Sequence, residues 1–384
     1  MRRVSRTARV TLKGADTPLT DRYDVALLDL DGVVYVGEQA VDGVPRALAE
    51  VRRRGMRLAF VTNNAARPPL AVAQRLNALG VPAGPADVIT SAQAAAHYLA
   101  DRLPQHAKVL VVGTVGLDEA LTERGLAPVH EDENSVAAVV QGYSPSLDWK
   151  QLAEGAVAIR RGVPWVATNL DATVPSPRGP LPGNGSMVAA LRQATGLDPV
   201  VTGKPDPTMH RESVQRSGAK RPLVVGDRLD TDIEGATAAG CPSMVVLSGV
   251  TVPYDLIGAG REFRPSFLAH DARGLLESHA APTVQAGEAR CGSWQAAHES
   301  GNVLRLSRLG TAKTSGASAQ GGFAGEDPTV SGEDGLDALR ALCTAAWDVA
   351  APRRERARKG EEVGFHFTCA DAPSEAALQS LGLR

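Results

Sequence analysis

Short apolar runs alternate with amphipathic stretches along most of the chain, from Tyr23 to about Glu277. The apolar runs predict buried strands with the sequences VALLDL, RLAFVTN, KVLVVGT, AAVVQGY, PWVATN, PLVVGD and SMVVLSG. The stretches between them predict helices over Val44–Arg54, Leu70–Leu79, Ala92–Arg102, Trp149–Arg161, Ser186–Thr195, Thr208–Ser217 and Ile233–Ala239. Such alternation is typical of a parallel sheet with helices on both faces, so the pattern predicts an α/β protein.

Polar residues interrupt the apolar pattern where several predicted strands end. Asp29, Thr62, Asn63 and Asp227 each stand at or just after such an end, and Asp31 follows closely. Ligands of open parallel sheets bind at the carboxyl ends of the strands. One pocket is therefore expected to collect these side chains.

The segment DLDGVVYVG places two carboxylates, Asp29 and Asp31, at the end of a strand that is predicted to be buried. A hard divalent cation held by oxygen ligands would offset their mutual repulsion. The Asp29 carboxylate is suited to attack a phosphoryl group, and Asp31 to exchange protons with the leaving alkoxide and the attacking water. Gly32 permits a tight turn and a close backbone approach to a ligand. Taken alone, the segment is equally compatible with two acids in a surface turn.

Two further segments carry groups that suit phosphate oxygens. In FVTNNAARP, the Thr62 hydroxyl and the Asn63 amide stand at a strand end, although a capped helix start is the commoner explanation of such a stretch alone. In VTGKPDP, Lys204 lies between a glycine and a proline. A fixed ammonium there would neutralise a phosphoryl group and hold Asp29 ionised, whereas a lone lysine is usually a solvated surface residue.

A last acidic segment, PLVVGDRLDTDIEGA, follows another predicted strand. Asp227 comes directly after the apolar run, and Asp230 and Asp232 precede a predicted helix. Asp227 would ligate the metal, while Asp232 would orient the metal's water molecules or Lys204. Asp230 is expected to cap the helix.

In this order, the DxDG motif, the strand-end threonine, the lysine and the GDxxxTD motif resemble the four signature motifs of the haloacid dehalogenase (HAD) superfamily of phosphatases. The resemblance implies a Rossmann-like core, a Mg²⁺ cofactor and a phosphoaspartate intermediate. It implies that Asp29 is the nucleophile and Asp31 the general acid and base. The metal would be bound by the carboxylates of Asp29 and Asp227 and by the backbone carbonyl of Asp31.

The resemblance also implies which residues bind the phosphoryl group. Thr62 and Lys204 would bind it, and Gly32 and Asn63 would line its cradle. A loose transition state with charge on its equatorial oxygens requires this kind of positioning and electrostatic stabilisation.

The stretch between Thr62 and Lys204 is far longer than a strand–helix connection requires, and it has a strand–helix alternation of its own. A separate domain is expected at about residues 67–201, with residues 23–66 and 202–278 forming the catalytic core. This position resembles that of the C2-type cap of HAD subfamily IIA, which includes NagD, 4-nitrophenylphosphatases, pyridoxal phosphate phosphatase and mammalian phosphoglycolate phosphatase.

Within the expected cap, ATNLDATVPSPRGPLPGNGSMVAAL resembles a TNxD…PGxGS stretch that faces the core site in that subfamily. The resemblance makes Asn169, Asp171, Arg178 and Asn184 candidates for contact with the leaving group, and loop geometry is the alternative for its prolines and glycines. Ser186 is expected to cap the helix that follows. This form of the stretch looks most like actinobacterial members described as glycerol 3-phosphate phosphatases.

Both ends of the chain lie outside the resemblance to the core and cap. Residues 1–22 are basic and lack the apolar segment of a secretory signal, which predicts a disordered arm, with an artefact of an upstream start codon as the alternative. Residues 279–384 are expected to hold a flexible linker and a small C-terminal domain, with a hairpin around Ser300–Asn302 and a helix that carries Leu336, Leu339, Leu342 and Trp347 on one face. The actinobacterial members carry an extension likened to a remnant acetyltransferase fold, and this tail is a candidate for the same kind of element.

Composition narrows the classes of function. The chain of 384 residues is too long for one typical core, and its net charge of −2 argues against a general nucleic-acid or membrane-surface binder. No apolar run reaches the roughly 20 residues of a membrane span. The four cysteines lack metal-ligand spacing and are expected to be reduced thiols of a cytoplasmic protein.

The sequence therefore predicts a cytoplasmic, Mg²⁺-dependent phosphomonoesterase that acts on a small organic phosphate, with glycerol 3-phosphate as the first choice. Phosphoglycolate, pyridoxal phosphate, 4-nitrophenyl phosphate and nucleoside monophosphates are the alternative substrates. A phosphotransferase or mutase and a regulatory protein with a vestigial site are the alternative classes. The expected partners are the substrate and a second copy of the chain bound through the cap, with no nucleic acid and no membrane.

Overall fold

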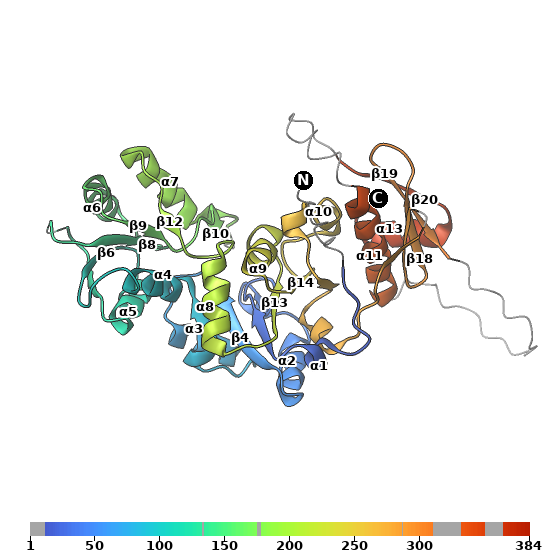
Figure 1. Cartoon of the computed structure of the whole chain (residues 1–384), viewed down its shortest axis with the longest axis horizontal. Helices are drawn as coiled ribbons and strands as arrows, with labels where there is room; N and C mark the ends of the chain where they lie inside the picture. The colour runs from blue at the N-terminus through green and yellow to red at the C-terminus, as the bar shows by residue number, and fades with distance from the viewer. Residues whose placement is uncertain (1–11, 133, 175–177, 286, 310–331, 350–363) are drawn as a thin grey trace, which may run out of the picture.

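Three lobes lie in a row in the computed structural model, which describes residues 12–132, 134–174, 178–285, 287–309, 332–349 and 364–384 (Figure 1). The cap lies at the left of the view, the catalytic core in the middle and the C-terminal lobe at the right (Figure 1). Both the core and the cap are parallel sheets between helices. The α/β class and the inserted cap predicted from the sequence are confirmed.

The core is built on six parallel strands in the order β15-β14-β13-β1-β4-β5. Their bounds are β1 (Val25–Leu28), β4 (Arg57–Thr62), β5 (Val88–Thr90), β13 (Pro222–Gly226), β14 (Ser243–Val246) and β15 (Phe267–Ala269). The central β1 pairs with β4 on one side and with β13 on the other. Because all three run in the same direction, the residues that follow them meet at one edge of the sheet.

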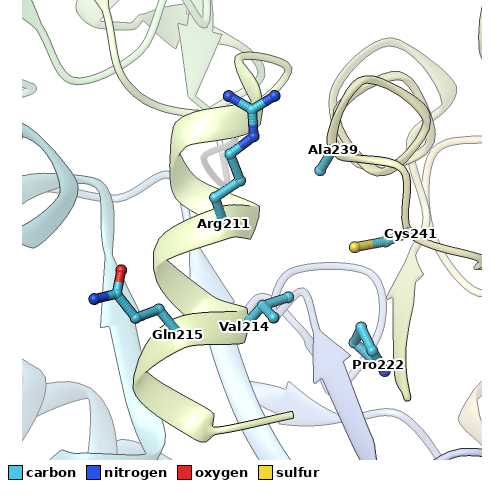
Figure 2. Close-up of a pocket in the computed structure, with 6 residues that line it drawn as sticks. All are labelled: Arg211, Val214, Gln215, Pro222, Ala239 and Cys241. Atoms are coloured by element: carbon cyan, nitrogen blue, oxygen red, sulfur yellow. The ribbon is translucent and has the colours of Figure 1, made fainter. Parts of the chain in front are cut away.

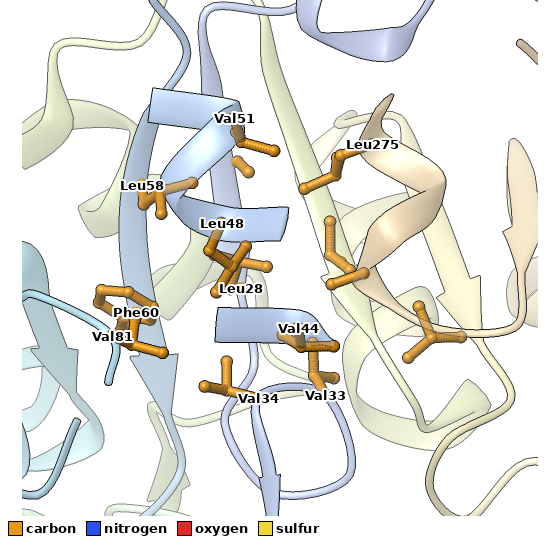
Figure 3. Close-up of a cluster of buried hydrophobic side chains, with 14 of the residues drawn as sticks. Leu28, Val33, Val34, Val44, Leu48, Val51, Leu58, Phe60, Val81 and Leu275 are labelled. Carbon is orange, nitrogen blue, oxygen red and sulfur yellow. The ribbon is translucent and has the colours of Figure 1, made fainter. Parts of the chain in front are cut away.

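Successive residues of β1 pack into two different layers, as the two-residue period of a strand requires. Ala26 and Leu28 face the layer that contains α2 (Val44–Arg53), α3 (Pro69–Ala78) and the 3₁₀ turn η4 (Ala272–Leu276) (Figure 3). Val25 and Leu27 face the layer that contains α8 (Pro207–Ser217) and α9 (Glu234–Ala239). Burial on both faces explains why the segment before Asp29 is wholly apolar.

The cap begins later in the chain than the sequence predicts. Residues 67–90 were assigned to the cap, but β5 pairs with β4, with Val88 opposite Phe60, and α3 packs on the core. The 3₁₀ turn η1 (Pro85–Asp87) connects these two core elements, and α4 (Ser91–Ala100) contributes side chains to the layers of both lobes. The predicted boundary at residue 67 is therefore wrong. The three-residue strand β5 is too short to give a periodic signal and was not predicted, so its pairing with β4 could not be foreseen.

The cap sheet has five parallel strands in the order β12-β9-β8-β6-β7. Their bounds are β6 (Lys108–Val112), β7 (Ala127–Val129), β8 (Ala138–Gln141), β9 (Trp165–Ala167) and β12 (Val200–Val201). Helix α5 (Val115–Glu123) packs on one face, and α6 (Trp149–Arg160) and α7 (Asn184–Thr195) pack on the other. A hairpin of β10 (Thr173–Val174) and β11 (Leu181–Pro182) lies between β9 and α7. The last strand of the cap sheet ends at Val201, which is also the predicted C-terminal boundary of the cap.

The segment before β1 is folded where the structure describes it. Leu12 and Ala15 are buried, Ala15 forms a bridge with His279, and helix α1 (Leu19–Arg22) buries Leu19 completely. The prediction of a disordered arm over residues 1–22 is therefore wrong for residues 12–22, and residues 1–11 lie outside the described part. The apolar residues of this segment are too widely spaced to form a strand or helix pattern, so only their tertiary contacts reveal them.

In its described residues, the C-terminal lobe has its own five-stranded sheet and two helices. The strands are β16 (Thr283–Gln285), β17 (Glu288–Cys291), β18 (Trp294–His298), β19 (Val303–Arg308) and β20 (His366–Cys369), and the helices are α11 (Gly332–Val349) and α13 (Ala372–Ser380). The predicted hairpin is confirmed as β18–β19, and the predicted helix as α11. The predicted flexible linker falls mainly on residues 310–331, outside the described residues. The likeness to an acetyltransferase stays a prediction.

The C-terminal lobe shares its hydrophobic core with the catalytic core. Leu336, Leu339 and Leu342 of α11 are buried in one cluster with Val245 of β14 and Leu268 of β15. Two short core elements, η3 (Arg261–Phe263) and α10 (Pro253–Ile257), also contribute to this cluster. The two lobes are therefore packed as one structural unit rather than joined by a linker alone.

Among the described residues, no helix has both the length and the apolar character needed to cross a membrane. The four cysteines are unpaired, and burial raises the pKa of Cys343, which disfavours the reactive thiolate.

Candidate active site

The turn after β1 is fixed by its contacts with β13 and with the residue that follows β13. The Asp29 N–H donates to the carbonyl of Val225 (2.8 Å), which continues the β1–β13 ladder by one residue. Gly32 has a φ of +80°, and a Cβ at this position would lie 2.3 Å from Oδ2 of Asp227. Glycine is therefore required here both for its left-handed backbone and for the close approach of the turn to Asp227.

Lys204 joins two carboxylates from different parts of the chain. Its Nζ lies 2.6 Å from Oδ1 of Asp29 and 2.6 Å from Oδ1 of Asp232, and it donates to the carbonyl of Val61 at 3.3 Å. Burial lowers the pKa of the Lys204 ammonium, but the carboxylates of Asp232 and Asp29 outweigh it and raise that pKa overall. The lysine is therefore a fixed cation, and it favours the ionised form of Asp29.

Burial raises the pKa of Asp29 itself, and the charge of Lys204 opposes this rise. The repulsion from Asp232 and Asp227 raises the pKa further. An Asp29 carboxylate is thus held between one cation and two other acids, and additional positive charge at this edge would stabilise its ionised form.

Asp227 follows β13, and only one of its two carboxylate oxygens accepts a hydrogen bond from the described residues. Its Oδ2 accepts a hydrogen bond from the backbone N–H of Val250 (2.7 Å), whereas its buried Oδ1 has no hydrogen-bond partner among the described residues. Burial first, and the charge of Asp232 second, raise the pKa of Asp227 to about 6. A buried carboxylate oxygen without a donor in the protein is open to a water molecule or a cation.

The carboxylates of Asp29, Asp227 and Asp232 each offer an oxygen within 4.8 Å of the others. All three are hard oxygen ligands of the kind that Mg²⁺ binds, so the residues fit the predicted metal. Both oxygens of Asp232 already accept hydrogen bonds, from Nζ of Lys204 and from the backbone N–H of Arg228 (3.2 Å). Asp29 and Asp227 are therefore the better ligands, and Asp232 is placed to orient Lys204.

The raised pKa of Asp227 predicts that metal affinity depends on pH. Above about pH 6 the carboxyl is ionised and free to bind a cation, whereas below it a proton competes with the metal. The affinity for Mg²⁺ is expected to be constant at pH 7–8 and to fall about tenfold for each unit below pH 6. Titration calorimetry with Mg²⁺ at pH 5, 6, 7 and 8 measures this, and an affinity independent of pH would contradict it.

Thr62 is the last residue of β4 and Asn63 follows it, but their side chains have different roles. The buried Oγ1 of Thr62 accepts from the backbone N–H of Asn64 (3.1 Å), which leaves its O–H free to donate to a ligand. Nδ2 of Asn63 donates instead to the carbonyl of Lys204 (3.1 Å) and to Oδ2 of Asp171 (3.3 Å). Both donors of the Asn63 amide are therefore occupied within the protein, which disfavours its predicted place in the phosphate cradle.

Three of the four predicted cap residues are linked to the core by hydrogen bonds: Asn169 and Asp171 lie in the loop after β9, and Asn184 is the first residue of α7. Nδ2 of Asn169 donates to the carbonyl of Asn63 (2.7 Å), and Nδ2 of Asn184 donates to the carbonyl of Asn169 (2.8 Å). Asp171 is half-buried, and burial raises the pKa of its carboxyl while Arg228 opposes this most strongly. Arg178 is exposed at the turn between β10 and β11. Asn169 and Asn184 thus hold the loop, and Asp171 is a cap carboxylate that contacts the core residue Asn63.

Two predicted helix caps are wrong. The Asp230 carboxylate pairs with the guanidinium of Arg228 (2.8 Å) instead of capping the helix, which begins here with a π-helical turn, η2 (Leu229–Ile233). Ser186 Oγ donates to the carbonyl of Ala172 (2.7 Å), and the helix cap is at Gly183. Asp230 pairs with a neighbouring side chain, and Ser186 donates to a backbone carbonyl of another segment. Neither side chain therefore caps its helix.

The loop after β14 belongs to the site and was not predicted from the sequence. Ser248 Oγ donates to the carbonyl of Gly32 (2.6 Å), and the N–H of Thr251 donates to the carbonyl of Asp227 (3.0 Å). A Cβ on Gly249 would lie 2.0 Å from Oδ2 of Asp227, so the loop must pass close to that carboxylate. The signal available in the sequence was its position at the carboxyl end of a predicted strand.

Arg75 is a second unpredicted neighbour of the site. It comes from α3 and lies over the ring of Tyr35 (4.3 Å to the centroid) in the small hairpin of β2 (Tyr35–Val36) and β3 (Gln39–Ala40). Burial raises the pKa of Asp31, and Arg75 is the charge that opposes this most. Nothing in the spacing of an amphipathic helix indicates this contact.

A cavity of about 220 Å³ lies between α8 and the segment after α9, lined by Arg211, Val214, Gln215, Pro222, Ala239 and Cys241 (Figure 2). Pro222 is the first residue of β13, whereas Asp227 follows the last. This cavity is therefore at the opposite edge of the sheet from the carboxylates and is not part of the site.

Family models match both halves of the core. The model of haloacid dehalogenase-like hydrolases matches residues 26–127, and a second, HAD-hydrolase-like model matches residues 201–275. The chain is 43% identical over 365 residues to the D-glycerol 3-phosphate phosphatase of Mycobacterium tuberculosis, which covers 95% of this chain and 96% of that protein. It is 34% identical over 237 residues to an acid sugar phosphatase of Staphylococcus aureus, which covers 61% of this chain and 90% of that protein.

Solved structures show the same likeness. The glycerol phosphate phosphatase of Mycobacterium tuberculosis in complex with magnesium matches with a TM-score of 0.80 and 40% identity, covering 97% of this chain and 100% of that chain. A 4-nitrophenylphosphatase from Thermotoga maritima matches with a TM-score of 0.62 and 30% identity, covering 67% of this chain and 97% of that chain. The first match includes the C-terminal lobe, and the second is confined to about two thirds of the chain.

Proposed function

The chain belongs to the haloacid dehalogenase-like hydrolase family, and we propose that it hydrolyses glycerol 3-phosphate with Mg²⁺ as its cofactor. The observation that carries the choice of substrate is the length of the match to D-glycerol 3-phosphate phosphatase, which includes the C-terminal lobe. The acid sugar phosphatases match a shorter part of the chain. The phosphatase class itself follows from the family and from both kinds of relative.

In the first half of the proposed reaction, an oxygen of Asp29 forms a bond to phosphorus while the bond from phosphorus to the glycerol oxygen breaks. The departing alkoxide takes a proton from Asp31, which burial helps to keep protonated. Lys204 and the hydroxyl of Thr62 are placed to hold the phosphoryl oxygens. Mg²⁺ bound by Asp29 and Asp227, with the carbonyl of Asp31 as the predicted third ligand, would neutralise charge on those oxygens.

In the second half, a water oxygen forms a bond to phosphorus and the bond to Asp29 breaks. Asp31 takes the proton of the water, which restores its acid form, and inorganic phosphate leaves. The Asp29 carboxylate is regenerated beside Lys204, whose charge stabilises it as a leaving group.

Asp171 supports glycerol as the leaving group. A half-buried carboxylate on the core side of the cap can accept hydrogen bonds from hydroxyl groups. The same charge would repel the carboxylate of phosphoglycolate. Trp165 of the cap is buried in the cap core, so it has no face open for stacking on a nucleotide base.

The proposed specificity predicts a ranking of substrates. The kcat/KM for glycerol 3-phosphate is expected to exceed that for phosphoglycolate, pyridoxal phosphate and nucleoside monophosphates by at least about tenfold, because cap contacts act on the transition state. Steady-state phosphate release measures the ranking. A preference for nucleoside monophosphates would reject the proposed substrate while leaving the phosphatase class in place.

A phosphotransferase or mutase would use the same aspartyl intermediate with an alcohol in place of water. Equal amounts of glycerol and free phosphate released in water distinguish hydrolysis from transfer. The complete set of Asp29, Asp31, Lys204 and Asp227 argues against a vestigial site. A homodimer through the cap and a cytoplasmic location stay predictions, and light scattering of the purified chain tests the first.

A further inference from the structure

Asn63 connects the lysine of the site to the cap. Its Oδ1 accepts the backbone N–H of Lys204 (2.8 Å), and its Nδ2 donates to the carbonyl of the same residue (3.1 Å). The amide side chain thus pairs with both polar groups of the Lys204 backbone, as a neighbouring strand would. The Lys204 backbone is thereby fixed to the end of β4, next to Asp29.

The same residue is the docking point of the cap loop. The Asn63 carbonyl accepts from Nδ2 of Asn169 (2.7 Å), and Nδ2 of Asn63 also reaches Oδ2 of Asp171 (3.3 Å). Within the loop, the N–H of Asp171 donates to Oδ1 of Asn169 (3.1 Å). Asn169 therefore uses its amide on both sides, toward the core and toward its own loop.

The chain returns from the cap to the core at Gly203, where the backbone is closely packed between Thr168 and Asn63. A Cβ on Gly203 would lie 2.1 Å from the carbonyl of Thr168 and 2.8 Å from Oδ1 of Asn63. The residue before Lys204 is thus pressed between the end of cap strand β9 and the Asn63 side chain. A shift of the cap loop would be transmitted to Lys204 because close-packed backbone cannot absorb it.

We propose that Asn63 is a positioning residue that couples the docking of the cap loop to the placement of the Lys204 ammonium. When the loop is docked, the Asn63 amide is held from both sides and Lys204 is kept within 2.6 Å of both Asp29 and Asp232. When the loop leaves, Asn63 loses its cap partners and the Lys204 backbone loses its fixed neighbour. Lysine placement, and with it the reaction of Asp29, then depends on cap residues that do not touch the phosphoryl group.

The proposal is tested with the full chain and a double-mutant cycle of Asn63→Ala and Asn169→Ala. Asn169→Ala is expected to lower kcat about tenfold for both glycerol 3-phosphate and 4-nitrophenyl phosphate, because the effect reaches Asp29 through Lys204 rather than through the leaving group. Asn63→Ala is expected to lower kcat about 30-fold or more. The double variant should lose no more than Asn63→Ala alone.

Hydrogen exchange gives a second measurement that needs no turnover. In both single variants, amide exchange in residues 202–206 and in residues 168–171 is expected to rise together by about tenfold or more. The kinetic measurement depends on the proposed phosphatase function, whereas exchange does not. An inactive wild type with coupled exchange would reject the proposed function alone.

The matched control is Asn64→Ala. Asn64 is the next residue and is exposed, and its Oδ1 accepts the local N–H of Ala66 (2.8 Å), so kcat should stay within about threefold of wild type. Asn63→Asp, which keeps the acceptor for the Lys204 N–H and loses both donors, serves if Asn63→Ala does not fold. If Asn169→Ala raises KM for glycerol 3-phosphate alone and leaves exchange in residues 202–206 unchanged, Asn169 is a substrate contact and the coupling is wrong.

Discussion

Replacing Asp29 with asparagine is expected to lower kcat for phosphate esters by at least about 10⁴-fold. Asparagine has nearly the same shape, so the turn at Gly32 and the β1–β13 ladder should remain. Its amide is a poor nucleophile and cannot form the aspartyl phosphate. It also removes the charge that pairs with Lys204 at 2.6 Å. Phosphate release from glycerol 3-phosphate in saturating Mg²⁺ measures the loss.

The control for this variant is Asp230→Asn. Asp230 lies at the same edge of the sheet, but its carboxylate is exposed and pairs with Arg228. Loss of an exposed ion pair of this kind costs at most about 1 kcal/mol of stability. Activity is expected to stay within about threefold of wild type. If Asp29→Asn retained Mg²⁺-dependent hydrolysis, the covalent mechanism would be rejected, because water would then attack the substrate directly.

Deleting residues 279–384 is expected to abolish the soluble, folded protein. The deletion would uncover apolar side chains of the catalytic core that now pack against the C-terminal lobe. They are Ile233, Val245, Leu256, Ile257 and Leu268. Full burial of each such side chain contributes about 1.5–3 kcal/mol. Even partial exposure of five is comparable with the total stability of about 5–15 kcal/mol that a domain has.

Polar contacts across the same interface would be lost as well. Nε1 of Trp347 donates to the carbonyl of Leu256 (3.2 Å), and Arg340 donates to the carbonyl of Leu268 (3.1 Å). The Tyr254 hydroxyl accepts the N–H of Phe365 (3.1 Å). Removal of the lobe would leave core carbonyls that now accept these bonds without their partners.

Soluble yield and thermal unfolding of the truncated chain test this expectation. Leu339→Ala perturbs the same interface less severely. It should lower the free energy of unfolding by about 2–5 kcal/mol because the side chain is fully buried. Val284→Ala in the same lobe is the control, since Val284 is 41% exposed and should change stability by less than about 0.5 kcal/mol. A truncated chain that stays monomeric with an unchanged unfolding temperature would show that the lobe is independent.

Much of the site could be predicted because its chemistry is attached to strand ends. Asp29, Thr62 and Asp227 each follow a strand that is visible as an apolar run, and parallel strands deliver such residues to one edge. Lys204 and Asp232 were placed by their motifs, and the structure brings both within 2.6 Å of each other. The position of each residue in the chain was enough to predict that these side chains gather in one site. It was not enough to predict which atom each side chain bonds.

Asn63 and Asn184 show where this reasoning fails. The resemblance to the family made both of them candidates for contact with a ligand, yet both donate to backbone carbonyls of other segments. An asparagine that binds a ligand and one that holds a loop have the same sequence signature, because the choice depends on which carbonyls the fold brings within reach.

By itself, the sequence determined the alternation of strands and helices, the set of acids, hydroxyl and lysine at the strand ends, and the presence of an inserted domain. Each of these depends on local periodicity or on residue type. Only the tertiary structure decided that β5 joins the core, that Leu12, Ala15 and Leu19 of the N-terminal segment are buried, and that the C-terminal lobe shares a core with the catalytic lobe. It also decided that Asn63 joins Lys204 to the cap. These are contacts between segments far apart in the chain, and no local pattern specifies which distant surface a segment will meet.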